Sequence, residues 1–395
     1  ATLQGRVKFS RLAIGNLVLI LLFTFGVYFF YRTADATLQD YLIFLMFAMI
    51  GPITAVILLG FWGTFGRIFD LRQSKRIIGR IDVGQLIAAI GSYLAIPLLA
   101  DIIPNTSTYL LISAISIGIA LIFLIFLHIN ADEVQSTMNF REQRQATQYT
   151  KLMKNQYVRL LSSFLIISMI TFTFIQFSFQ IGSAAQFPDE TDLRSFVSIF
   201  TGSVLILGFL MQSFVNDRVI SEYGLKVALL ILPIIVGVFT VAAITAFTLF
   251  NLGVIEDSIY FFLFIALSRL FNWSIRDSLE NPTFKLYFMP FNIDVRFNIQ
   301  TKVEGVVNES ARFLAGLLIL GLFALPFITI IHISIAVLLL VGGYFVVVKK
   351  LYQGYRSMIA EKLENQQREA SPETVMTLNE QMVVRICLLY TSPSP

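Results

Sequence analysis

The chain has 395 residues, of which 56% are hydrophobic and only 14% are charged, and its formal net charge is +4. A soluble domain carries about 25% charged residues. This composition excludes a soluble enzyme, a disordered chain and a fibrous protein. It predicts an all-α polytopic membrane protein, because long apolar helices are the usual way for such a chain to cross a bilayer.

Ten apolar segments are long enough to cross a membrane, for which a helix needs about 20 apolar residues. They lie at 11–31, 40–65, 82–102, 107–130, 157–184, 193–215, 225–250, 258–274, 303–325 and 327–348. The segment at 258–274 is short and carries Arg269, so hydropathy does not define the residue at which its cytoplasmic end lies. A polar, basic stretch at 131–156 separates the first four segments from the last six.

The distribution of positive charge tests this count. If the N-terminus is cytoplasmic, the inside segments hold 22 Lys and Arg residues, Arg276 and Lys285 among them, and the outside loops hold only Arg32 and Arg194. This asymmetry follows the positive-inside rule. It predicts that both visible ends of the chain are cytoplasmic. We expect the membrane to be a bacterial inner membrane.

Two groups of spans joined by a long cytoplasmic loop resemble the major facilitator type of transporter, which has two bundles of six helices. The resemblance implies that residues 1–130 are an N-terminal bundle lacking the first two of twelve helices. Residues 131–156 are then the central loop, and 157–348 a complete C-terminal bundle. A cytoplasmic helical tail follows at 349–385, and residues 386–395 resemble the translated read-through of a sequencing adapter.

The loop after the second span of the C-terminal bundle supports this resemblance. It carries Asp217, Arg218 and Gly224. This order resembles a short loop of the major facilitator superfamily, in which an Asp-Arg pair is followed by a glycine and a basic residue. A tight turn at Gly224 would let the charges at the helix ends connect neighbouring helices.

Two further segments resemble the ATP/ADP translocase family of plastids and intracellular bacteria. Residues 61–79 lead from an aromatic helix end through Asp70 to basic residues and a glycine; the basic residues are Arg72, Lys75 and Arg76. Residues 272–290 resemble the family's loop between its tenth and eleventh helices, with Lys285 in place of an acidic residue. The resemblance implies that the substrate is a nucleotide, but it assigns no substrate ligand in this chain.

Ionisable residues inside a membrane are costly and usually face a cavity or a partner. Arg269 and Arg312 lie about eleven and nine residues into their spans, which corresponds to depths of roughly 17 and 14 Å. Glu309 precedes Arg312 by three residues and shares its helix face, and Glu304 lies a turn nearer the cytoplasm. We expect the two arginines to bind an anion and the glutamates to couple ions or to gate. The alternative is a structural ion pair that locks neighbouring helices.

Three of the amides within the predicted spans are candidate binding residues. Gln176 and Gln180 are one turn apart among aromatic residues, and Asn16 lies in the first visible span. Buried amides must find partners, so these side chains either select the substrate or form hydrogen bonds between helices.

The sequence therefore predicts a secondary transporter that moves an organic anion, with nucleotide exchange as the first candidate, by alternating access. The alternative is a non-transporting membrane scaffold of the same fold, whose cytoplasmic helical tail binds a protein partner. One cysteine, two histidines and the absence of a phosphate-binding loop or a catalytic triad argue against an enzyme, a metal site and a cofactor. The expected partners are membrane lipid and a small anionic substrate, not nucleic acid.

Overall fold

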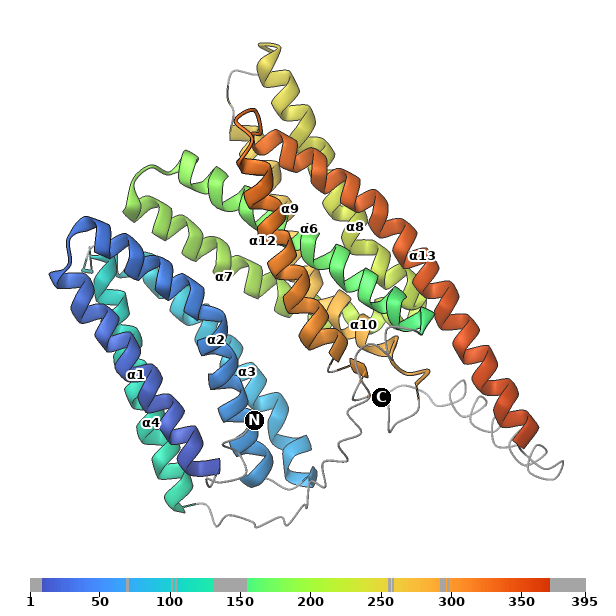
Figure 1. Ribbon diagram of the computed structural model, residues 1–395, viewed down its shortest axis with the longest axis horizontal. Helices are drawn as coiled ribbons and strands as arrows, with labels where there is room; N and C mark the ends of the chain where they lie inside the picture. The colour runs from blue at the N-terminus through green and yellow to red at the C-terminus, as the bar shows by residue number, and fades with distance from the viewer. Residues whose placement is uncertain are drawn as a thin grey trace. The chain divides into compact units, whose positions relative to one another are not determined.

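The computed structural model describes residues 9–68, 71–100, 102–103, 105–130, 155–254, 257, 259–291, 296, 299–300 and 302–369 (Figure 1). The regular elements in these ranges are helices, and no strand occurs among them. The chain divides into two compact units, residues 1–144 and 145–395. The predicted central loop, 131–156, lies outside the described residues except for its last two positions.

The first unit contains four helices, drawn in blue to teal in Figure 1. They are α1 (Phe9–Thr33), α2 (Ala36–Ile68), α3 (Leu71–Leu98) and α4 (Thr106–Asn130). Helix α1 packs against both α2 and α4. Small or β-branched side chains such as Ala13, Thr24 and Ala114 are buried there, which lets the helices approach closely.

The second unit is built around α6 (Gln156–Gln186), which contacts α9, α12 and α13. The other elements of this unit, in chain order, are α7 (Glu190–Phe214), α8 (Asn216–Asn251), α9 (Ile259–Ile275), η1 (Arg276–Glu280), α10 (Asn281–Leu286), η2 (Lys302–Val307), α12 (Asn308–Phe323) and α13 (Ile330–Glu369). The segments η1 and η2 are π-helical turns, in which the backbone hydrogen bonds span five residues.

Helix α6 begins at Asn155, whose side-chain oxygen accepts hydrogen bonds from the backbone N–H groups of Tyr157 and Val158. Such a cap satisfies donors that have no partner within the helix. Fifteen residues of α6 are buried. A polar cap and a long buried face together explain why this helix forms the centre of the unit.

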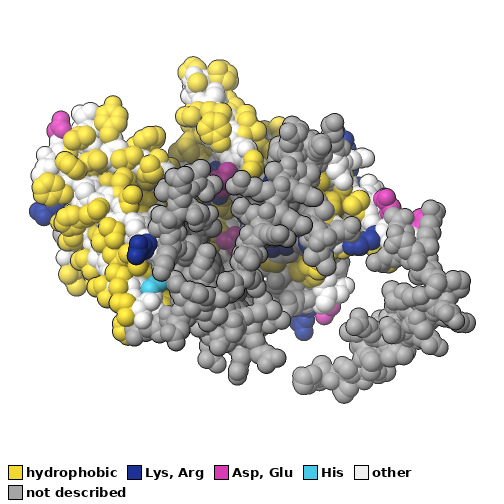
Figure 2. All heavy atoms as spheres, turned by 60° about the horizontal axis from the view of Figure 1, so that its bottom comes forward, with side chains coloured by type: hydrophobic (Ala, Val, Ile, Leu, Met, Phe, Trp, Pro, Cys, Tyr) yellow, Lys and Arg dark blue, Asp and Glu magenta, His cyan; other side chains and the backbone are white. Residues whose placement is uncertain are grey.

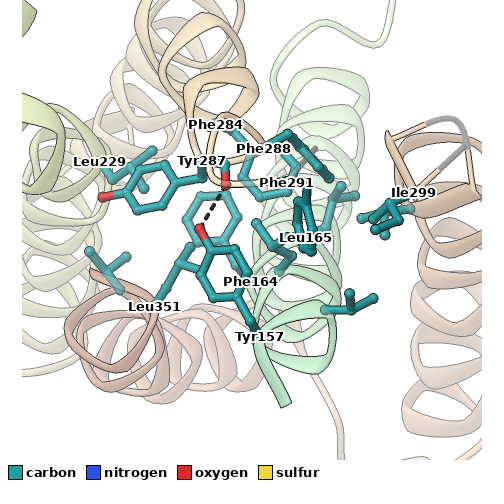
Figure 3. Packing of buried hydrophobic residues seen from close by; sticks show 14 of the residues in the cluster. Tyr157, Phe164, Leu165, Leu229, Phe284, Tyr287, Phe288, Phe291, Ile299 and Leu351 are labelled. Atoms are coloured by element: carbon teal, nitrogen blue, oxygen red, sulfur yellow. Dashed lines mark hydrogen bonds between the residues drawn. The ribbon is translucent and has the colours of Figure 1, made fainter. Parts of the chain in front are cut away.

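An aromatic cluster joins α6 to α10 and α13 (Figure 3). The hydroxyl of Tyr157 donates a hydrogen bond of 2.7 Å to the carbonyl oxygen of Tyr287. The ring of Phe164 stacks on Phe284, with 4.9 Å between centroids. A Cβ added at Gly354 of α13 would lie 3.0 Å from the Tyr157 ring, so the glycine permits the close approach of these two helices.

Nine helices in the described part of the chain are long and apolar enough to cross a membrane. The segment expected at 82–102 instead forms the shorter apolar helix Val83–Leu98 within α3. Figure 2 shows hydrophobic side chains over much of the described surface, as expected for contact with lipid. The chain is a multi-pass membrane protein.

The span expected at 258–274 is longer than the sequence indicated. Helix α9 continues through η1 and α10, so that the candidate span is Ile259–Leu286. The prediction that Arg276 lies in a loop is therefore wrong, since this residue is helical and its side chain is only 8% exposed. Hydropathy ended the span too early because charged residues follow Ile275, and the fold gives those charges buried partners.

The helical tail is continuous with the last span. Helix α13 runs past Lys349 and Lys350 to Glu369, and its apolar span of 35 residues, Ile330–Glu364, would measure roughly 52 Å. That length exceeds the hydrocarbon core of about 30 Å, so part of α13 extends beyond it. The tail packs on its own unit, with Lys362 donating to the carbonyl oxygen of Pro290 at 3.3 Å. The rest of the predicted tail, 370–385, and residues 386–395 lie outside the described residues.

Candidate functional site

The second unit contains a cavity of about 360 Å³ lined by residues of α6, α7 and α9. Its polar lining includes Gln176 and Gln180 from α6 and Arg269 from α9, and the rings of Phe179, Phe200 and Trp273 also border it. The fold thus brings three of the predicted substrate-binding residues to one cavity.

The two glutamine amides face this cavity without internal partners. Gln176 is half-buried and Gln180 is exposed. Neither side chain forms a hydrogen bond with another described residue. An amide in a membrane-spanning segment needs a partner, and both amides are placed to bind a molecule in the cavity.

Arg269 is the charged group of the cavity. It is 4% exposed, and its guanidinium carbon lies 4.5 Å from the ring centroids of both Phe172 and Trp273. Cation–π contacts of this kind contribute about 2 kcal/mol when they are shielded from water. No carboxylate oxygen of a described residue lies within 4.0 Å of the guanidinium, and its Nη1 has no hydrogen-bond partner there.

The π-helical turn η1, directly after α9, contains three more charged residues. Within η1, Arg276 is buried, its guanidinium carbon lies 4.6 Å from the Phe172 ring centroid, and its Nη2 lies 3.2 Å from the Met169 sulfur. Arg269 and Arg276 therefore contact the same aromatic ring. Single π-helical turns occur frequently at functional sites, and this one buries Arg276 and Glu280 while Asp277 stays at the surface.

Asp277 positions the tryptophan that contacts Arg269. Its carboxylate accepts hydrogen bonds from Nε1 of Trp273 at 2.9 Å and from Nδ2 of Asn281 at 3.1 Å. The first of these bonds fixes the indole plane. Asp277 thus acts on the cavity through Trp273 rather than by pairing with the arginine.

Glu280 is a buried carboxylate that connects three elements. It is 2% exposed and accepts hydrogen bonds of 2.5 Å from the hydroxyls of Ser168 on α6 and Tyr344 on α13. Bonds this short are typical of hydroxyl groups that donate to a charged oxygen. The carboxylate lies one helical turn beyond Arg276, within electrostatic range of it.

Arg312 and Glu309 lie in a different environment. They form an ion pair of 3.6 Å on α12, and their side chains are 54% and 64% exposed. Glu304 on η2 accepts a hydrogen bond of 3.1 Å from Gln300. None of the three lines the cavity of Arg269, so the structure of the second unit does not bring the two predicted arginines into one site there.

The remaining predicted residues are distributed elsewhere. Asn16 belongs to the first unit, where it lines an otherwise largely apolar cavity of about 430 Å³. Asp70 and the side chains of Arg72, Lys75, Arg76 and Asp217 lie outside what the structure describes. Gly224 interrupts α8 with φ 76° and ψ 172°, a left-handed conformation that suits glycine, and the nearby Arg218 pairs with Glu222 at 3.6 Å on the surface.

The sequence reasoning missed the roles of Trp273, Arg276, Asp277 and Glu280. Their spacing contained a usable signal, because Trp273 and Asp277, and Arg276 and Glu280, are four residues apart. Such spacing places side chains on one helix face, which favours a continuing helix over a loop.

No protein-family model matches the chain, and no curated protein matches its sequence. Several solved structures resemble it, including the following two. The structure of a bacterial metal transporter is 15% identical, with 87% of this chain and 84% of that chain covered and a TM-score of 0.56. A bacterial homologue of the iron transporter ferroportin, in an inward-facing state, is 14% identical, with 87% and 82% covered and a TM-score of 0.57.

The chain has the fold of these transporters. The predicted fold class, an all-α polytopic fold of the major facilitator type, is confirmed. The narrower resemblance to the ATP/ADP translocase family finds no support in these comparisons.

Proposed function

We propose that the chain is a secondary transporter that carries an organic anion across the membrane by alternating access. The observation that carries this proposal is Arg269, a buried guanidinium that borders a cavity within a membrane-spanning unit and has no carboxylate partner among the described residues. A charge inside a membrane-spanning unit is costly and usually faces a cavity or a partner. The transporter fold supports the same conclusion.

The cavity lining favours an anion that also has a flat or polar part. A guanidinium binds carboxylate or phosphate oxygens in a fixed planar geometry. The amides of Gln176 and Gln180 offer both donors and acceptors, and aromatic rings border the same cavity. Its volume lies within the range of about 300–1,000 Å³ for small-molecule sites. Nucleotides are the first members of this class to test.

A metal cation and a pure scaffold role are the alternatives. The two similar structures are described as metal and iron transporters, but a cation in this cavity would meet the positive charge of Arg269. No group of three or more His, Cys, Asp or Glu side chains suited to a metal occurs among the described residues. A scaffold would have no need for an arginine without a carboxylate partner beside a cavity.

Uptake into proteoliposomes that contain the full chain tests the proposal. Labelled ADP, ATP and citrate are compared with ferrous iron, and at least one of the anions is expected to accumulate. Arg269→Ala should abolish that uptake, whereas Arg159→Ala, which removes an exposed arginine from α6 away from the cavity, serves as the matched control. Iron uptake without anion uptake, or unchanged uptake in a folded Arg269→Ala variant, would refute the proposal.

A further inference from the structure

Glu280 is a titratable group that anion binding at Arg269 does not itself require. The carboxylate is held between α6, η1 and α13 by two hydroxyl donors, Ser168 and Tyr344. No Lys or Arg nitrogen in the described part of the chain lies within 4.0 Å of it. It is therefore a buried carboxylate that is hydrogen-bonded but not ion-paired.

Two hydroxyl partners suit a group that changes its protonation state. In its charged form the carboxylate accepts a hydrogen bond from both hydroxyls. When one oxygen binds a proton, it becomes a donor, and a hydroxyl can rotate and accept that bond because it carries lone pairs as well as a proton. An arginine or lysine partner has no acceptor and would hold the carboxylate in its charged form.

The charges around Glu280 connect it to the cavity. Arg276 and Asp277 lie on the same π-helical turn, and Tyr344 is the titratable group that faces it from α13. From α6 the facing group is Ser168, and the described parts of α7, α8 and α10 add no charged neighbour to this set. Arg276 shares the Phe172 ring with Arg269, so a line of groups runs from the carboxylate to the cavity.

We propose that Glu280 is the proton-binding site that couples anion transport to a proton gradient, an inference that rests on the proposed function. A proton from water binds an oxygen of the carboxylate and removes its negative charge, which leaves the charge of Arg276 less compensated. The cavity becomes more positive and binds an anion more tightly. By linkage, a bound anion promotes protonation equally, so the proton and the anion move in the same direction.

The expected size of this coupling is modest. Glu280 lies eleven residues from Arg269, which corresponds to roughly 16 Å along a helix. At an effective dielectric constant of about 20, one unit charge at that distance changes an anion's affinity about fivefold. The burial of Glu280 also separates its proton from water in this conformation, which transport without proton leakage requires.

Infrared difference spectroscopy of the full chain in lipid tests proton binding without any substrate. As the pH is lowered, the wild type should gain a carboxylic C=O band that is missing in Glu280→Gln and retained in Glu309→Gln, the exposed control. Tyr344→Phe removes a donor to the charged form and should move the titration midpoint of that band to higher pH. A band that is absent, independent of pH or still present in Glu280→Gln would overturn the proposal, as would an unmoved midpoint in Tyr344→Phe.

Transport then separates this inference from the proposed function. With ADP and citrate as probes, Glu280→Gln should lose uptake driven by a pH gradient and keep exchange of internal for external anion. Gradient-driven uptake that survives in Glu280→Gln would overturn the coupling role alone. If the wild type carries neither probe while the infrared band titrates, the proposed function fails for these anions, and the proton site stands.

Discussion

The segments α9–η1 and η2–α12 of the second unit contain the same kinds of structural feature, but their charged side chains lie in different surroundings. Each combines a π-helical turn with an arginine and nearby carboxylates. In α9–η1 the charged side chains Arg269, Arg276 and Glu280 are buried. In η2–α12 the pair of Glu309 and Arg312 is mostly exposed. The contrast shows that depth along a span does not determine whether a charge is buried.

The difference arises from the helices that pack on each segment. Residues on α6 and α13 supply the partners of the α9–η1 charges, namely Phe172, Ser168 and Tyr344. Arg312 and Glu309 are each other's ion-pair partners within α12. A surface ion pair contributes about 0–1 kcal/mol, whereas hydrogen bonds to buried charges contribute about 1.5–3 kcal/mol each. The first segment should therefore be far more sensitive to substitution.

The largest expected effect is the loss of anion binding in Arg269→Ala. If Arg269 holds the anion with charged hydrogen bonds, its removal costs about 1.5–3 kcal/mol, which is roughly a 10- to 100-fold loss of anion affinity. Arg312→Ala, the matched substitution in the second segment, should leave the anion affinity nearly unchanged, because Arg312 does not line the cavity. Equilibrium binding of the transported anion to both purified variants measures the difference. Equal losses would mean that the two arginines share one site, as the sequence suggested.

The second prediction concerns the stability of the segment around Glu280. Tyr344→Phe deletes one of the two donors to a buried carboxylate and should destabilise the protein by about 1.5–3 kcal/mol. Tyr352→Phe is the control on the same helix, because the phenylalanine keeps the ring that faces Lys226. Thermal unfolding in detergent at neutral pH compares the two. An unfolding temperature for Tyr344→Phe equal to that of Tyr352→Phe would show that the hydrogen bond contributes little.

The fold could be predicted from the sequence because hydropathy reports directly on membrane-spanning helices. Arg269, Gln176 and Gln180 could also be found, since each is a polar exception within an apolar run. Their meeting at one cavity depends on how α6 packs against α9, and hydropathy contains no information on which helix faces meet.

The network around Glu280 could not be predicted for a related reason. Ser168 and Tyr344 are 112 and 64 residues away from it in sequence, and each is a common residue in an apolar helix. Without knowledge of these partners, Arg276, Asp277 and Glu280 have the pattern of a solvated loop. For Arg312 the error is the opposite one, an exposed residue that was expected to be buried. Its depth of roughly 14 Å along the span suggested burial, whereas its side chain is 54% exposed.

The third prediction separates the two contacts of Trp273. Trp273→Ala removes the ring beside Arg269 and the hydrogen bond to Asp277, and it should weaken anion affinity about tenfold if the cation–π contact contributes about 1–2 kcal/mol. Trp273→Phe keeps a ring and loses only the hydrogen bond, so a loss of about threefold is expected. Anion binding by the two variants tests this order. If the phenylalanine variant is as weak as the alanine variant, orientation by Asp277 matters more than the aromatic contact.

The smallest expected effect is that of Glu309→Gln, and it decides where coupling takes place. The sequence alone assigned ion coupling to Glu309, but its side chain is 64% exposed and, among the described residues, pairs with Arg312 at 3.6 Å. Neutralising it should change stability by less than about 1 kcal/mol and leave the pH dependence of anion uptake unchanged. Uptake measured across a range of pH, with Glu280→Gln in parallel, gives the answer. If Glu309→Gln removes the pH dependence and Glu280→Gln retains it, the exposed carboxylate is the coupling group, because an exposed site can exchange protons with water in the conformation described here.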